Sequence, residues 1–132
     1  MRQIDKIIIH CSATNEEQDF CARDIDRWHK ARGWSEIGYH FVIRLDGTLE
    51  IGRRLEVAGA HCFGYNKRSI GICYIGGCDE NGTPKDTRTE KQKRALRSIL
   101  GILNQDYPKA TTHGHNEFSK KACPSFDVKT EL

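Results

Sequence analysis

"DKIIIHC", residues 5–11, is the stretch that most directly predicts the fold of this chain. Three consecutive isoleucines are typical of a strand that is buried on both faces of a sheet. The run closes on His10, and a polar side chain at the end of an apolar strand needs a polar partner. Because the carboxyl ends of strands in open α/β sheets commonly line the functional site, His10 becomes a candidate site residue.

The rest of the chain alternates helical and strand-like patterns. The elements expected after the first strand are a helix over 22–34 that Gly33 ends, a hairpin over 38–53 with its turn at Asp46-Gly47, a strand over 69–77, a helix over 89–106 and a short strand over 109–115. Thr89 and Gln92 fit a capping box at the start of the long helix. Its predicted apolar face contains Ala95, Leu96, Ile99, Leu100, Ile102 and Leu103. His29, in the first helix, is expected at the helix surface. This order predicts an α/β (α+β) fold, a single domain over residues 1–132 with a central mixed β-sheet flanked by helices.

Composition narrows the classes of partner. The chain has 132 residues, a net charge of +3 and no dense stripe of Lys and Arg, so no nucleic acid is expected as a partner. Its apolar runs are too short to cross a bilayer, so no membrane is expected either. "MRQIDKIIIH" lacks the pattern of a signal peptide, which predicts synthesis in the cytoplasm. The six cysteines show no CxxC spacing and are expected to be mostly reduced.

"THGHNEFSKKACPSFD", residues 112–127, places two histidines near a cysteine. Zinc binds imidazole and thiolate readily, and a catalytic zinc site keeps three protein ligands and one open position. Cys123 and one of His113 and His115 would supply two ligands, and His10 is the leading candidate for the third. Taken singly, such a histidine is more often a hydrogen-bonded rim residue and such a cysteine is more often buried. A closed, structural site completed by Cys11 or Cys62 is the alternative.

Four segments carry a family resemblance: "IIIHCSAT", "RGWSEIGYHFVIRLDGTLEIGR", "HCFGYNKRSIGICYIGG" and "HNEFSKKACPSFD". They resemble the zinc-dependent N-acetylmuramoyl-L-alanine amidases, in the type-2 amidase group shared by phage lysozyme-type amidases and peptidoglycan recognition proteins. The resemblance is closest to the phage branch and runs from about residue 7 to about residue 128. It implies a fold like that of the peptidoglycan recognition proteins.

The resemblance also implies roles for individual residues. The implied zinc ligands are His10, His115 and Cys123, with His113 as a fallback because residues two apart on a strand share a face. The implied catalytic residues are Tyr39 and Lys121, and the implied substrate-groove residues are His61 and Asn66.

The function implied is hydrolysis of the amide bond between N-acetylmuramic acid and L-alanine by zinc-activated water. The implied cofactor is Zn²⁺, and the implied partners are peptidoglycan and its muropeptides. The protein is expected to be a monomer that acts on the cell wall after release or export. Two alternatives are a non-catalytic peptidoglycan-binding module and a regulatory protein that binds another partner.

Overall fold

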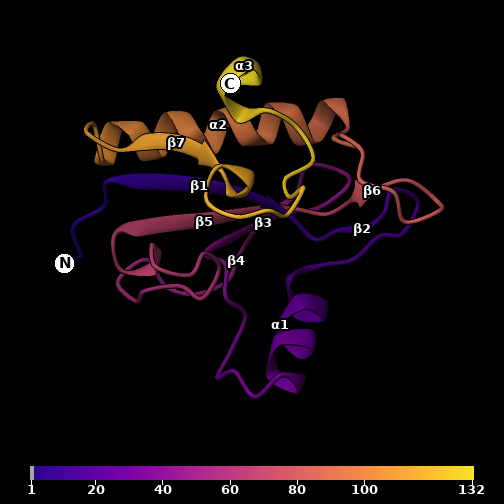
Figure 1. Cartoon of the computed structure of the whole chain (residues 1–132). Helices are drawn as coiled ribbons and strands as arrows, with labels where there is room; N and C mark the ends of the chain where they lie inside the picture. Colours follow the sequence, from indigo (N-terminus) through magenta and orange to yellow (C-terminus); the bar gives the residue numbers. More distant parts are fainter. Residues whose placement is uncertain (1) are drawn as a thin grey trace.

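The computed structural model describes residues 2–132 and has a five-stranded sheet at its centre (Figure 1). The order across the sheet is β4-β3-β5-β1-β7. Its strands are β1 (Lys6–Cys11), β3 (Phe41–Ile43), β4 (Leu49–Ile51), β5 (Ser69–Tyr74) and β7 (Thr111–Gly114). β4 pairs antiparallel with β3, and the other neighbours pair in parallel. The mixed sheet expected from the sequence is therefore confirmed.

β1 is an interior strand, which explains its run of isoleucines. It pairs with β5 on one side and with β7 on the other, so both of its edges are hydrogen-bonded. Alternate residues of a strand point to opposite faces. Ile7 and Ile9 belong to the larger core cluster, whereas Ile8 and His10 share the other face, and all four are buried. The strand thus places His10 on a definite face of the sheet.

Helix α2 (Glu90–Asp106) covers one face of the sheet, as Figure 1 shows. The predicted capping box is present: Thr89 Oγ1 accepts the N–H of Gln92 at 3.0 Å, and Gln92 Oε1 accepts the N–H of Thr89 at 2.9 Å. The short helix α3 (Val128–Glu131) packs on the same side. The prediction for Ile102 was wrong: it is 56% exposed, because it lies at the edge of the helical face that carries the buried Leu96, Ile99, Leu100 and Leu103.

Helix α1 (Ala22–Ala31) lies on the opposite side of the sheet (Figure 1). It packs through Ile25 on a second core cluster that includes Val42 of β3 and Cys73 of β5. His29 was expected at the helix surface, and this prediction was wrong. It is buried, because its Nδ1 accepts the backbone N–H of Gly38 at 2.9 Å and its ring packs on Trp34.

Two short strands, β2 (Thr14–Asn15) and β6 (Gly77–Cys78), form a separate two-stranded sheet. β2 lies in a segment expected to be loop, and β6 begins at the last residue of the strand expected over 69–77. Two 3₁₀ turns, η1 (Asn66–Arg68) and η2 (His115–Glu117), stand before β5 and after β7. Across residues 2–132, no helix has the length and apolar character needed to cross a membrane.

Candidate metal and catalytic site

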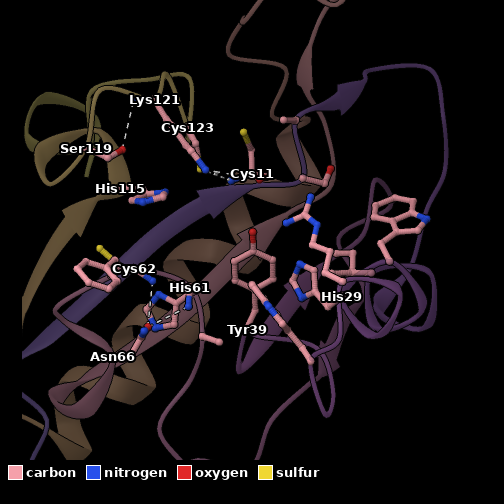
Figure 2. A pocket seen from close by; sticks show the side chains of 18 residues that line it. Cys11, His29, Tyr39, His61, Cys62, Asn66, His115, Ser119, Lys121 and Cys123 are labelled. Carbon is pink, nitrogen blue, oxygen red and sulfur yellow. Dashed lines mark hydrogen bonds between the residues drawn. The ribbon is translucent and has the colours of Figure 1, made fainter.

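A pocket of about 530 Å³ opens beside the carboxyl end of β1. Its walls come from separate parts of the chain: the segment after β1, helix α1, the residues before β3, the loop before η1 and the segment after β7. Figure 2 shows Tyr39, His61, His115, Lys121 and Cys123 around one space. The sheet topology thus brings together residues that are far apart in the sequence, as the strand-end argument predicted.

His10, His115 and Cys123 form a compact group of potential metal ligands. One ligand atom from each side chain lies within 4.8 Å of those of the other two, and within residues 2–132 this is the single such group of three or more. His10 Nδ1 is 3.7 Å from Cys123 Sγ, and the rings of His10 and His115 are 4.6 Å apart between centroids. Two imidazoles and one thiol at this spacing fit a zinc ion.

Cys123 is held in place by the buried hydroxyl of a tyrosine on β5. Tyr74 Oη donates to the carbonyl oxygen of Pro124 at 2.7 Å, and Ser125 Oγ donates to the carbonyl of Gly77 at 2.8 Å. The backbone N–H of Cys11 also donates to Cys123 Sγ at 3.2 Å. These bonds fix the segment that carries Cys123 against the end of the sheet.

Both histidines of the group are held in the neutral form that a metal ligand requires. Burial lowers the pKa of His10 well below its usual value, and the neighbouring His61, His115 and Lys121 lower it further. Burial and the charge of Lys121 also lower the pKa of His115. Each imidazole therefore keeps a lone pair available near neutral pH.

The thiols of Cys11 and Cys123 influence each other. The neighbouring Cys123 thiol lowers the pKa of Cys11 to about 7, and the neighbouring Cys11 thiol together with burial raises the pKa of Cys123. A divalent cation bound to Cys123 would make the pKa of Cys123 the lower of the two, because a coordinating thiol is deprotonated outright. The hydrogen bond from the Cys11 N–H would then stabilise the Cys123 thiolate.

Tyr39 and Lys121 both reach the pocket. In Figure 2 the phenolic oxygen of Tyr39 points into the space that His115 and Lys121 border. The ring of Tyr39 lies 5.0 Å from that of His10 between centroids. Burial raises the pKa of Tyr39 well above its usual value, so the phenol stays protonated and can donate a hydrogen bond.

His61 and Asn66 line the pocket, and their polar atoms also bond within the protein. His61 Nδ1 is 2.8 Å from His10 Nε2, and His61 Nε2 is 3.2 Å from Ser69 Oγ. Asn66 Oδ1 accepts the backbone N–H groups of His61 and Cys62. Burial lowers the pKa of His61 to about 3, and the neighbouring charged groups contribute less to this shift. The contact of His61 and Asn66 with substrate stays a prediction. The structure shows that both side chains also form hydrogen bonds within the protein.

His113, the fallback ligand, bonds to other partners. Its Nδ1 is 2.9 Å from Glu117 Oε1 and its Nε2 is 2.6 Å from Thr111 Oγ1. The argument that His113 and His115 share a face does not apply, because β7 ends at Gly114 and His115 begins η2. His115, which follows the end of β7, is thus the histidine that lies beside His10.

Comparison with known proteins gives the family. Residues 1–126 match the family described as N-acetylmuramoyl-L-alanine amidase. The chain belongs to the N-acetylmuramoyl-L-alanine amidase family.

Individual relatives and solved structures resemble this chain over nearly its whole length. The endolysin of Klebsiella phage KP32 is 45% identical over 128 residues, which cover 97% of this chain and 85% of the relative. The solved N-acetylmuramoyl-L-alanine amidase LysC from Clostridium intestinale superposes with a TM-score of 0.84 at 32% identity, covering 98% of this chain and 82% of that one. Bumblebee PGRP-SA superposes with a TM-score of 0.82 at 26% identity, covering 99% and 81%.

The amidase-type site contains three features that the sequence pattern did not predict: the Cys11 contact with Cys123, the Tyr74 hydroxyl behind Pro124, and the bond between His10 and His61. Each joins residues more than 45 positions apart, and only the pairing of the strands places them together. The signal available in the sequence was limited to a tyrosine at the end of an apolar strand and a cysteine next to His10.

Proposed function

We propose that this chain hydrolyses the amide bond between N-acetylmuramic acid and L-alanine in peptidoglycan, with a zinc ion held by His10, His115 and Cys123. The observation that supports this most directly is the convergence of the three ligand atoms within 4.8 Å of one another, beside a pocket that His115 and Cys123 line. Neither Cys11 nor Cys62 joins that group. Three protein ligands without a fourth are typical of a catalytic rather than a structural zinc site.

The metal and the pocket residues Lys121 and Tyr39 have separate roles in amide hydrolysis. When bound, zinc lowers the pKa of a water molecule and polarises the substrate carbonyl. The ammonium group of Lys121 stabilises the negative charge that develops on the carbonyl oxygen of the tetrahedral intermediate. Tyr39 donates its phenolic proton in a hydrogen bond to the same oxygen or orients the attacking water, because its pKa keeps it protonated.

The rest of the proposal concerns the substrate and the setting. His61 and Asn66 lie on the pocket wall where the sugar or the stem peptide would pass. Peptidoglycan and its muropeptides are the partners, and residues 1–132 act as one catalytic domain, as a monomer. Synthesis in the cytoplasm followed by release or export would bring the protein to the cell wall.

Digestion of purified peptidoglycan tests this proposal. Zinc-loaded protein should free the amino group of L-alanine, detected by end-group labelling and by mass spectrometry of the products. New reducing ends without freed L-alanine would contradict the amidase assignment. Binding of muropeptides with no turnover, even with zinc added, would identify a non-catalytic binding module instead.

A further inference from the structure

His10 presents its two ring nitrogens to two different neighbours. Nδ1 lies 3.7 Å from Cys123 Sγ, on the side of the metal-ligand group. Nε2 lies 2.8 Å from Nδ1 of His61, and the two rings meet edge to face. His10 is 1% exposed, so water does not compete for Nε2. The orientation of the His10 ring therefore depends on His61.

The positions of the ring hydrogens follow from this arrangement. A neutral imidazole carries one N–H, and a nitrogen that binds a metal must keep its lone pair. For a metal bound at Nδ1 of His10, the ring hydrogen of His10 would be on Nε2 and would donate to Nδ1 of His61, 2.8 Å away. His61 would then carry its own hydrogen on Nε2 and donate it to Ser69 Oγ, 3.2 Å away. The chain His10–His61–Ser69 has one consistent direction, and it ends on a fully buried hydroxyl.

The His61 ring is fixed in this place by its surroundings. Asn66 Oδ1 accepts the backbone N–H of His61 at 2.9 Å. Two glycines leave room for the ring: a Cβ atom at Gly71 would lie 2.7 Å from His61 Cγ, and one at Gly59 would lie 2.6 Å from His61 Cδ2. Any larger residue at either position would displace the ring. The Asn66 hydrogen bond and the close backbone at Gly59 and Gly71 thus fix the position of the ring that accepts from His10.

We propose that His61, with Ser69 behind it, is a positioning residue that holds His10 in the tautomer and orientation needed for metal binding. This rests on the proposed function, because it takes His10, His115 and Cys123 as the ligands. Groups that accept the second N–H of a ligating histidine typically contribute about 10- to 100-fold to metal affinity. Neither sugar nor peptide is needed for this role of His61.

An isosteric pair of variants isolates the hydrogen bond from the packing. His61→Asn keeps an acceptor near the position of Nδ1, whereas His61→Leu has the same shape and no acceptor. Zinc affinity is measured by competition with a chromophoric chelator. His61→Leu should bind zinc about 10- to 100-fold more weakly than the wild type, and His61→Asn should stay within a few-fold of it. Equal affinities for the two variants would overturn the proposal, since packing alone would then account for any loss.

Two further variants serve as a second test and as a control. Ser69→Ala removes only the end of the chain of hydrogen bonds and should weaken zinc binding several-fold; if His61→Leu does not fold, an unchanged affinity in Ser69→Ala overturns the proposal. His113→Phe alters a histidine outside the ligand group and should leave affinity unchanged.

Zinc binding and cleavage are separate readouts. If the wild type binds zinc with the expected ranking of variants but frees no L-alanine, the proposed function fails and the role of His61 stands. If the wild type cleaves and His61→Leu binds zinc as tightly as His61→Asn, the role of His61 fails alone.

Discussion

Lys120 and Lys121 are neighbours in the chain, but of the two it is Lys121 that lines the pocket. Its ammonium group also lowers the pKa values of His10 and His115, which places its charge close to the ligands. Lys121→Ala should keep zinc affinity and fold while lowering kcat by roughly 10²–10³, the usual cost of removing one oxyanion donor. Lys120→Ala is the matched control and should keep full activity. Equal activity of the two variants would remove Lys121 from the mechanism.

Tyr39 offers a test that removes a single oxygen atom. The phenol is kept protonated by burial, and its oxygen points toward the ligand group (Figure 2). Tyr39→Phe keeps the ring that packs against His10 and His29. Turnover of peptidoglycan should fall by roughly 10²–10⁴ with zinc content unchanged. If zinc content falls in parallel with activity, the Tyr39 hydroxyl contributes to metal binding and not to the chemical step.

The attachment of the Cys123 segment to β5 determines how well the metal group is assembled. Tyr74→Phe removes the 2.7 Å hydrogen bond to the Pro124 carbonyl and leaves that oxygen without its buried donor. Such a loss costs about 1–3 kcal/mol of unfolding free energy, measured by urea denaturation, and zinc affinity should fall with it. Tyr65→Phe, which alters a tyrosine that is 38% exposed, is the matched control and should be nearly neutral. Equal stabilities would show that the segment is held by other contacts.

Prediction from sequence succeeded where one element determines its own pattern. The apolar run before His10 predicted an interior strand, and Thr89 with Gln92 predicted the start of α2. It failed where the outcome depends on a second element. His29 is buried because the backbone of Gly38 reaches it, and β2 exists only through its pairing with β6. The proposed ligands were found as candidates from residue type, but the resemblance, and not periodicity, separated His115 from His113.

Buried neutral histidines make the stability of the whole molecule sensitive to acid. Burial lowers the pKa of His40 from 6.5 to about 4, and its Nδ1 accepts the N–H of Gly71 while its Nε2 donates to the carbonyl of Val57. As the pH falls below about 6.5, the unfolded chain gains a proton that the native state takes up only near pH 4, so stability is lost in that window. This one group should account for up to about 3 kcal/mol. Urea denaturation at several pH values measures the loss. His40→Gln should show a shallower pH dependence between those values, and an unchanged slope would contradict the assignment.

Metal binding should also stabilise the molecule as a whole, because the proposed ligands join the first strand to the segment after the last one: His10 and Cys123 are 113 positions apart in the sequence. The unfolded chain holds no preformed site, so zinc binds the native state preferentially. At a free zinc concentration about 100 times Kd, the native state gains about 2.7 kcal/mol. Removing zinc with a chelator should therefore lower Tm by roughly 5–20 °C, measured by differential scanning calorimetry. His115→Ala should show almost no difference with and without zinc, because its site lacks one ligand. An equal Tm for zinc-loaded and chelated wild-type protein would mean that the three residues do not hold the ion together, and the catalytic proposal would lose its metal.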